Sequence, residues 1–341
     1  MFIHFNISNL LFILIMISSS LFSISTPSFI NMWMGMEVNL MAFIPLMINN
    51  SNSLSSESMM KYFLIQSLAS ANFLFMTTIL FIISKWFTMF SFKSILIMIL
   101  LNVSLLMKMG AAPLHFWFPK VVKGLSWNNC MILMTWQKII PMIIISYYFI
   151  ETLVIFFIIF SCMTGSIMGL NQTSMLMIMT YSSINHISWM LSCLILNTNL
   201  WFMYFLIYSL MTIIMILNFN LIQIFNLIQL YSKKIPFYLN FLILMNFLSM
   251  GGLPPFLGFL PKWITLNMLI NNNFYWLSMM LIFTSLISLF FYIRISYSFL
   301  VLNFPKMKSN FIMINKINST NLLYYLYLHL YHLFFFIKTL S

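Results

Sequence analysis

The sequence has very few charged side chains. Charged residues make up 5% of the 341 residues, aspartate is absent, and there are only three glutamates. Soluble domains carry about a quarter charged residues, so this composition excludes a water-soluble globule. The net charge of +12 comes mainly from lysines that lie singly or in pairs among apolar segments. These lysines therefore indicate the flanks of membrane helices and not a nucleic-acid surface.

Cysteine is also scarce. Cys130, Cys162 and Cys193 occur singly inside apolar segments and form no C-x-x-C pair. Isolated cysteines of this kind are typical of core thiols, not of a metal site, an iron–sulfur site or a disulfide. Gly-rich loops that cradle phosphates are missing as well. We therefore expect this chain itself to hold no cofactor and no metal.

Hydrophobic residues fill the sequence instead, at 62%, with a mean hydropathy of +1.02. Runs of about 20 apolar residues can each span a bilayer as a helix. We predict an all-α polytopic membrane protein with about eleven transmembrane helices in a single transmembrane domain, residues 1–341. The predicted spans lie near residues 5–25, 29–48, 59–84, 94–119, 127–148, 151–170, 173–196, 199–226, 237–270, 274–302 and 322–340. The first run has no basic leader or cleavage site, so we expect it to be a retained span.

Two of these spans contain similar glycine- and proline-rich interruptions. The first reads Met109-Gly110-Ala111-Ala112-Pro113, and the second reads Met250-Gly251-Gly252-Leu253-Pro254. Each continues to a Pro-Lys pair, which suggests that Pro113 corresponds to Pro254 with one extra residue before the second pair. Broken backbone is tolerated in lipid only where protein buries it or water reaches it. Such a pair in matching positions of two halves indicates a transport site.

The two broken spans lie five spans apart, so they should cross the membrane in opposite directions. This predicts two inverted five-helix repeats, approximately 1–148 and 151–302, each with one broken helix. A C-terminal polar segment and last helix, 303–341, lie outside the repeats. Most loop lysines fall on one face, which the positive-inside rule assigns to the matrix or cytoplasm together with the N-terminus. The C-terminus should then lie across the membrane.

Four ionisable residues remain inside apolar spans: Glu37, Lys108, Lys138 and Lys262. A charge at the bilayer centre costs at least about 2.5–3.5 kcal/mol, so such residues usually face a protein interior or water. A static ion pair or snorkelling to the interface is the structural alternative for each. Each lysine also lies near a proline that should free a backbone carbonyl four residues earlier. These carbonyls, which could hold an ammonium group or water, belong to Met109, Gln137 and Leu257.

Other polar residues carry weaker signals. His186 lies mid-span among polar neighbours and fits either a proton relay or a satisfied core histidine. His115, just past the first interruption, fits a cap on loose backbone. Arg294 lies near the end of its span and should snorkel to the surface. Glu57 and Lys61 are four residues apart, a spacing that favours an ion pair at a helix start.

Seven motifs occur in an order that resembles the subunit 2 family of mitochondrial NADH–ubiquinone oxidoreductase, respiratory complex I. The resemblance covers about residues 29–302. The motifs are Trp33–Leu40, Lys61–Leu64, Lys108–Trp117, Thr135–Lys138, Gly169–Thr173, Tyr181–His186 and Gly251–Phe259.

This resemblance implies an antiporter-like fold and roles for the intramembrane charges. Glu37 and Lys108 would form the interacting pair of a first half-channel, and Lys138 would connect it to the centre. Lys262 would belong to the second half-channel, and His186 to the central hydrophilic axis. The family's wider relatives have fourteen spans, of which this chain lacks the first three. Lys120 stands where other members can carry an acidic residue, so it receives no role.

The function expected from the resemblance is proton translocation coupled to NADH oxidation by ubiquinone, within the inner mitochondrial membrane. The N-terminus would lie on the matrix side and the C-terminus on the intermembrane-space side. Expected partners are other membrane-arm and accessory subunits and lipid, without nucleic acid. FMN, iron–sulfur clusters, NADH and ubiquinone would bind elsewhere in the complex. The codon bias behind abundant Phe, Ile, Met, Asn and Tyr fits an organelle gene. A free-standing cation/proton antiporter and an inert membrane scaffold are the alternatives.

The missing cofactor motifs make the first prediction. The chain, isolated from the complex, should show no visible flavin or haem absorption and no electron-paramagnetic signal of an iron–sulfur cluster. A chromophore that co-purifies in stoichiometric amount and is lost on substituting one of the three cysteines would contradict this expectation.

Overall fold

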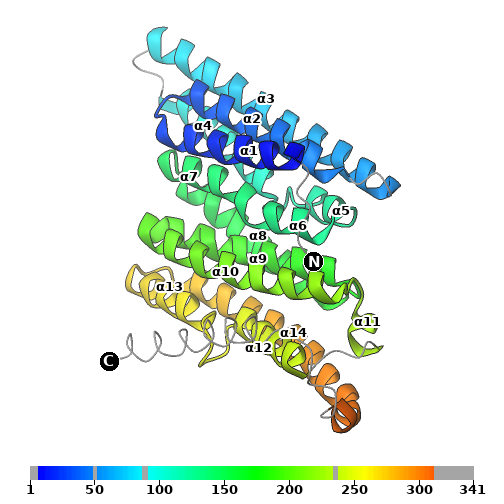
Figure 1. Cartoon of the computed structure of the whole chain (residues 1–341). Coiled ribbons are helices and arrows are strands. Elements are labelled where there is room, and N and C mark those ends of the chain that lie inside the picture. Colours follow the sequence, from blue (N-terminus) through cyan, green and yellow to red (C-terminus); the bar gives the residue numbers. More distant parts are fainter. Residues whose placement is uncertain (1–6, 49–51, 87–90, 233–236, 311–341) are drawn as a thin grey trace. The chain divides into compact units, whose positions relative to one another are not determined.

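The structure is a computed structural model that describes residues 7–48, 52–86, 91–232 and 237–310. Within these ranges the chain is helical, and one isolated β-bridge joins Ser174 and Asn226. The all-α prediction is therefore confirmed for this part of the chain. The chain forms two compact units, Met1–Ser161 and Cys162–Ser341, whose helices are coloured along the sequence in Figure 1.

The first unit is built from bundled helices. They are α1 (Ile7–Ser25), α2 (Phe29–Met47), α3 (Ser53–Trp86), α4 (Ser91–Met109), α5 (Trp117–Val122), α6 (Trp127–Met134), the 3-10 turn η1 (Trp136–Lys138), α7 (Ile139–Tyr147) and the first half of α8 (Glu151–Leu170). Helix α2 packs between α1 and α3, and α3 also packs on α4 and α5. Because α7 contacts both α1 and α4, the bundle closes around an interior.

Among its described residues, the second unit contains the rest of α8 and six further helices. They are α9 (Met175–Leu196), α10 (Thr198–Ile222), α11 (Leu227–Ser232), α12 (Phe237–Gly251), α13 (Phe259–Asn271) and α14 (Tyr275–Asn310). Helix α9 is buried from Met175 to Leu194, with Tyr181 as the exception. It packs against α10 and α13, while α12 packs on α10 and α14. A helix buried all round forms the core of a unit, and here that helix carries many polar residues.

Seven helical segments of the described chain are long and apolar enough to cross a membrane. The first ten predicted spans each overlap a helix or an interrupted pair of helices. The eleventh, 322–340, lies outside the described residues. The number of crossings and the inverted-repeat relation stay predictions.

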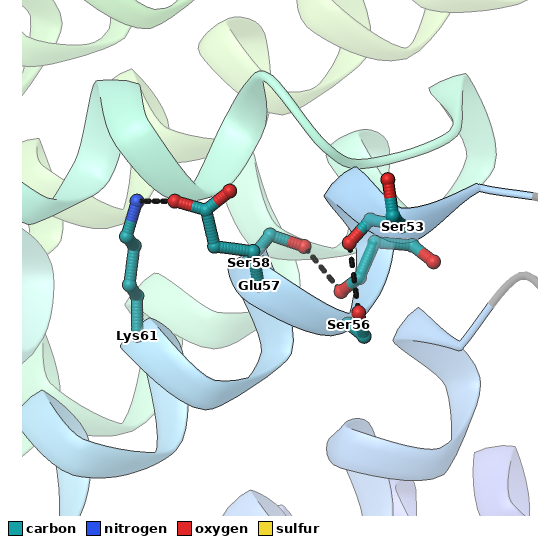
Figure 2. A network of polar contacts seen from close by, with 6 residues as sticks. Ser53, Ser56, Glu57, Ser58 and Lys61 are labelled. Atoms are coloured by element: carbon teal, nitrogen blue, oxygen red, sulfur yellow. Dashed lines mark hydrogen bonds and ion pairs between the residues drawn. The ribbon is translucent and has the colours of Figure 1, made fainter.

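The start of α3 carries the predicted ion pair. Lys61 bonds Glu57 one turn earlier on an exposed surface. Figure 2 shows this pair beside serine hydroxyls that bond within the same helix start, such as Ser56 to the Ser53 carbonyl at 2.7 Å. The predicted pairing is confirmed, and its exposure limits its contribution to stability.

Both predicted interruptions are real helix breaks, and their backbones share one spacing. Gly110 and Gly252 begin the breaks with φ angles of 74° and 81°, which favour glycine. Helix α5 begins at Trp117 and α13 at Phe259, the same number of residues after each glycine. This register pairs Pro113 with Pro255 and Lys120 with Lys262. The expected match of Pro113 to Pro254, with one inserted residue, is therefore wrong.

The second break depends on a close backbone approach at Gly258. A Cβ atom at Gly258 would lie 1.8 Å from the Ser249 carbonyl oxygen. Backbone on both sides would have to move to relieve this overlap. At Gly251, by contrast, the nearest atom to an added Cβ lies 3.5 Å away, an ordinary contact. The two glycines thus form a matched pair for mutation.

We predict that Gly258→Ala lowers the free energy of unfolding by about 1–3 kcal/mol or more, the usual cost of overpacking. Gly251→Ala should leave it nearly unchanged, because alanine suits a helix and its methyl group would make only ordinary van der Waals contacts. The measurement is the thermal unfolding midpoint of the detergent-solubilised protein carrying each substitution. Equal midpoints for the two variants would contradict the close approach.

Candidate functional site

Lys108 lies at the end of α4, where the first break leaves backbone carbonyls without helical partners. The Gln66 side chain donates to the Lys108 carbonyl at 3.1 Å, and Trp117 Nε1 donates to the Met107 carbonyl at 3.0 Å. The Lys108 side chain is 7% exposed, and its Nζ lies 3.6 Å from Met36 Sδ. A thioether is a weak acceptor for an ammonium group. The Lys108 ammonium group can therefore still form stronger hydrogen bonds with polar groups or water in the interior.

Lys138 occupies the turn between α6 and α7. It ends η1, and its side chain is only 2% exposed. The Nζ atom lies 5.6 Å from the centroid of the Phe118 ring, which provides a cation–π contact from the first break. Pro141, in the first turn of α7, is compatible with the helix there because that turn needs fewer backbone donors. The interruption of the helix at Lys138 thus has a local cause in the sequence.

One cavity of about 30 Å³ brings Lys108 and Lys138 together in the first unit. A single internal water needs about 10–15 Å³ of such space, so the cavity has room for about two waters. Polar and aromatic side chains share its lining with apolar ones. The other lining residues are Met36, Asn39, Leu40, Tyr62, Gln66, Met109, Trp117, Phe118, Leu133, Gln137, Ile140 and Pro141.

A hydrogen-bond network crosses this cavity wall beside Lys138. Asn39 Nδ2 donates to Gln137 Oε1 at 2.8 Å, and the Tyr62 hydroxyl approaches the same oxygen at 3.4 Å. These contacts link α2 and α3 to the 3-10 turn. Asn39, Tyr62 and Gln66 were not predicted as site residues, because none of them carries a charge. Amide side chains inside apolar spans were the available signal.

Glu37 lies on α2, one residue after Met36, and is half-buried. It interacts electrostatically with Lys108. The structure shows no direct ion pair between these two described side chains. Glu37 is thus close enough to influence Lys108 across a gap, and its predicted role as a coupling partner stays a prediction.

Lys262 lies in the first turn of α13 in the second unit. Its side chain is 6% exposed, and Nζ donates to the Gly251 carbonyl at 3.0 Å and to the Met250 carbonyl at 3.2 Å. An ammonium group is favourable there because a helix C-terminus carries partial negative charge. The predicted free carbonyl of Leu257 is wrong, since it accepts the backbone amide of Leu260 at 3.2 Å.

His186 lies on α9 in the core of the second unit. Its Nδ1 lies 2.9 Å from the Tyr204 hydroxyl, and its ring centroid lies 5.0 Å from that of Tyr208. The Tyr204 ring is nearly parallel to Trp189, and Lys262 Nζ lies 5.8 Å from the centre of the Trp189 ring. Lys262 and His186 therefore contact the same aromatic pair. The structure brings these two predicted residues into one buried cluster.

Two buried amides extend this polar interior and were missed from the sequence. Asn218 on α10 is fully buried, and neither its Nδ2 nor its Oδ1 atom has a protein partner. Asn246 on α12 has an unpartnered buried Nδ2 atom. Phe219 and Phe247, their next neighbours along the chain, contact each other with ring centroids 6.1 Å apart. The two amides thus lie along one helix contact, and Asn246 is one turn before Met250.

The other residues singled out in the sequence are His115, Arg294 and the three cysteines. His115 is buried just past the first break and its Nδ1 atom has no hydrogen-bond partner among the described residues, so the predicted cap stays a prediction. Arg294 is exposed and donates to the Leu170 carbonyl at 2.7 Å, at the end of α8. The three cysteines are buried and unbridged: Cys130, Cys162 and Cys193. No cluster of metal-ligating side chains occurs within the described ranges.

Most of the chain is similar to known proteins. Residues 26–288 match the family described as "NADH:quinone oxidoreductase/Mrp antiporter, TM". The chain is 45% identical to NADH-ubiquinone oxidoreductase chain 2 of Anopheles gambiae, over 93% of this chain and 94% of that one. Its identity to the protein of the same name from Locusta migratoria is 42%, over 87% and 86%.

Solved structures show a similar fold at lower identity. A chain of respiratory complex I from Thermus thermophilus, with bound aureothin, matches with a TM-score of 0.79 and 23% identity. The match covers 86% of this chain and 70% of that one. A chain of the Mrp complex from a Dietzia species matches with a TM-score of 0.73 and 15% identity, over 83% and 59%.

The two breaks offer a prediction about Lys262. The substitution Lys262→Met removes the donor to the Met250 and Gly251 carbonyls and should loosen the end of α12. Amide hydrogen exchange at residues 248–253 should then rise about fivefold or more, as expected for loss of a net hydrogen bond. Lys120→Met is the matched control, because Lys120 holds the corresponding position in the first break but is exposed. Unchanged exchange in Lys262→Met would show that the ammonium does not hold this break.

Proposed function

Because the chain belongs to the NADH-ubiquinone oxidoreductase chain 2 family, we propose that its buried lysines carry protons within respiratory complex I. The chain is an antiporter-like membrane subunit of this complex, in the mitochondrial inner membrane. Relatives that it matches along nearly their whole length bear the oxidoreductase name, which disfavours a free-standing antiporter. The observation that most supports proton transfer is the water-sized cavity shared by Lys108 and Lys138.

The chemistry follows from burial. An amine far from bulk water loses much of the solvation that favours its charged form, so it can release a proton at moderate cost. A proton on Lys108 also disfavours a proton on Lys138, because like charges repel strongly in a poorly polarisable interior. Waters in the shared cavity would let the proton pass from one amine to the other. Glu37, acting on Lys108, would bias which lysine holds the charge.

The second unit supplies a further group of proton-transfer candidates. Lys262 rests on the carbonyl end of α12, and His186 bonds Tyr204 in the same cluster. Imidazole titrates near neutral pH and suits a relay. By resemblance to the family, Lys262 would belong to a second half-channel and His186 to the central hydrophilic axis. These residues would continue the path beyond Lys138.

The energy for transfer would come from other subunits. We expect NADH, FMN, the iron–sulfur clusters and ubiquinone to bind there, and this chain to hold no redox cofactor. Neighbouring membrane-arm subunits would convert redox energy into conformational or electrostatic change at Glu37 and the lysines. The N-terminus would face the matrix and the C-terminus the intermembrane space, as the distribution of loop lysines indicates.

The test is the assembled complex carrying Lys138→Ala. Assembly should be largely retained, because alanine is a good helix former and the change removes a buried charge. Proton translocation per NADH oxidised should fall markedly, measured with the complex in sealed vesicles. Lys61→Ala, which removes an exposed lysine of the same unit, is the control and should pump normally. A normal proton-to-electron ratio in the assembled Lys138→Ala complex would refute the proposed role of Lys138.

A further inference from the structure

Helix α3 presents two polar side chains to the cavity one helical turn apart. Tyr62 and Gln66 are 3% and 6% exposed, and both line the cavity that holds Lys108 and Lys138. Residues four apart lie on one face of a helix, so the two groups are fixed relative to each other. Neither residue carries a charge that could move with a proton in the normal pH range.

Gln66 acts on the first lysine through its backbone. Its Nε2 atom donates to the Lys108 carbonyl at 3.1 Å, at the point where α4 ends. A buried carbonyl without a partner costs about 1–3 kcal/mol, so this bond fixes where the helix end lies. Because the Lys108 side chain starts from the same residue, the bond also fixes the origin of the amine.

Tyr62 acts on the second lysine through its neighbour. Its hydroxyl approaches Gln137 Oε1, the same atom that accepts the bond from Asn39. Gln137 directly precedes Lys138 in the 3-10 turn. A rigid Gln137 therefore sets where the Lys138 side chain leaves the backbone.

The start of α3 is itself anchored. A Cβ atom at Gly124 would lie 2.2 Å from the Leu54 carbonyl oxygen and 2.9 Å from Ser58 Cβ, so α3 packs directly on the backbone after α5. The Tyr62 ring also makes an edge contact with Phe43, at 5.3 Å between centroids. Contacts with Gly124 and with Phe43 thus hold α3 in place near Tyr62 and Gln66.

The second break shows why a neutral group matters at the first. In the shared register, Met250 corresponds to Lys108, and its carbonyl is held by the titratable ammonium of Lys262. The Lys108 carbonyl is held by an amide instead. The first break therefore keeps its cap whether Lys108 is charged or neutral. Lys108 can gain and lose a proton without releasing the helix end that carries it.

From this geometry we propose that Gln66 and Tyr62 are positioning residues that hold Lys108 and Lys138 at a fixed separation across the cavity. The proposal rests on proton transfer between these lysines as the function of the site. Transfer through one or two waters needs hydrogen-bond distances at every step, so a small displacement of either amine interrupts it. Gln66 is the stronger of the two, because its bond is shorter and direct.

The experiment compares variants of the assembled complex. Gln66→Met keeps the volume and removes the donor, and it should lower proton-coupled turnover about fivefold, the effect of one net hydrogen bond. Tyr62→Phe should lower it about twofold. Ser70→Ala is the matched control on α3, because the Ser70 hydroxyl donates to the Ser67 carbonyl of its own helix, at 2.9 Å, and does not line the cavity. It should turn over normally.

A double variant separates positioning from a general structural effect. If Gln66 acts through Lys108, then Gln66→Met should cause no further loss in a Lys108→Met background. Independent, additive losses would overturn the proposal. If Gln66→Met prevents assembly, Gln66→Asn is the substitute. It keeps the amide but moves the donor away from the Lys108 carbonyl by the length of one methylene, and it is compared in the same way with and without Lys108→Met. Normal turnover of an assembled Gln66→Asn complex would also overturn the proposal.

The outcomes also distinguish this proposal from the function on which it rests. Normal proton pumping in Lys108→Met and Lys138→Ala would refute the proton path as a whole. Impaired pumping in the lysine variants with normal pumping in Gln66→Met and Tyr62→Phe would refute only the positioning role.

Discussion

The interior of this protein depends on one constraint: backbone carbonyls left unpaired by a helix break must find donors away from water. In an apolar surrounding each unpaired group costs free energy comparable to a hydrogen bond. The first break meets this need with Gln66, which donates to the Lys108 carbonyl, and the second with Lys262. The positions of these donors determine which side chains face the interior and therefore where polar chemistry is available.

The two breaks have the same backbone spacing and different donors. A neutral amide holds the first, whereas an ammonium group holds the second. The first break is consequently insensitive to the charge of its own lysine. At the second, loss of a proton from Lys262 would weaken the bonds that close the end of α12. The same backbone geometry can therefore hold a helix end in a charge-independent or a charge-dependent way. The difference is whether the donor to the carbonyl is an amide or an ammonium group.

The cavity of the first unit explains how charged groups can be kept in an apolar bundle. Lys108 and Lys138 are buried on separate elements, yet both reach space large enough for about two waters. Water and neighbouring dipoles offset part of the cost of burying an ammonium group. Asn39, Tyr62 and Gln137 add polar groups that keep their own hydrogen bonds inside the wall. The site is therefore polar without containing a direct ion pair.

The sequence by itself determined the helical class, the two breaks and the residues Lys108, Lys138 and Lys262, because glycine, proline and charge are conspicuous in apolar segments. It also placed the Glu57–Lys61 pair, whose spacing is local. The register of the breaks, the donors to their carbonyls and the contacts of Gln66 and Tyr62 were decided only by the tertiary structure. Local propensity reports where a helix is weakened, but which side chain meets an unpaired carbonyl depends on how distant helices pack.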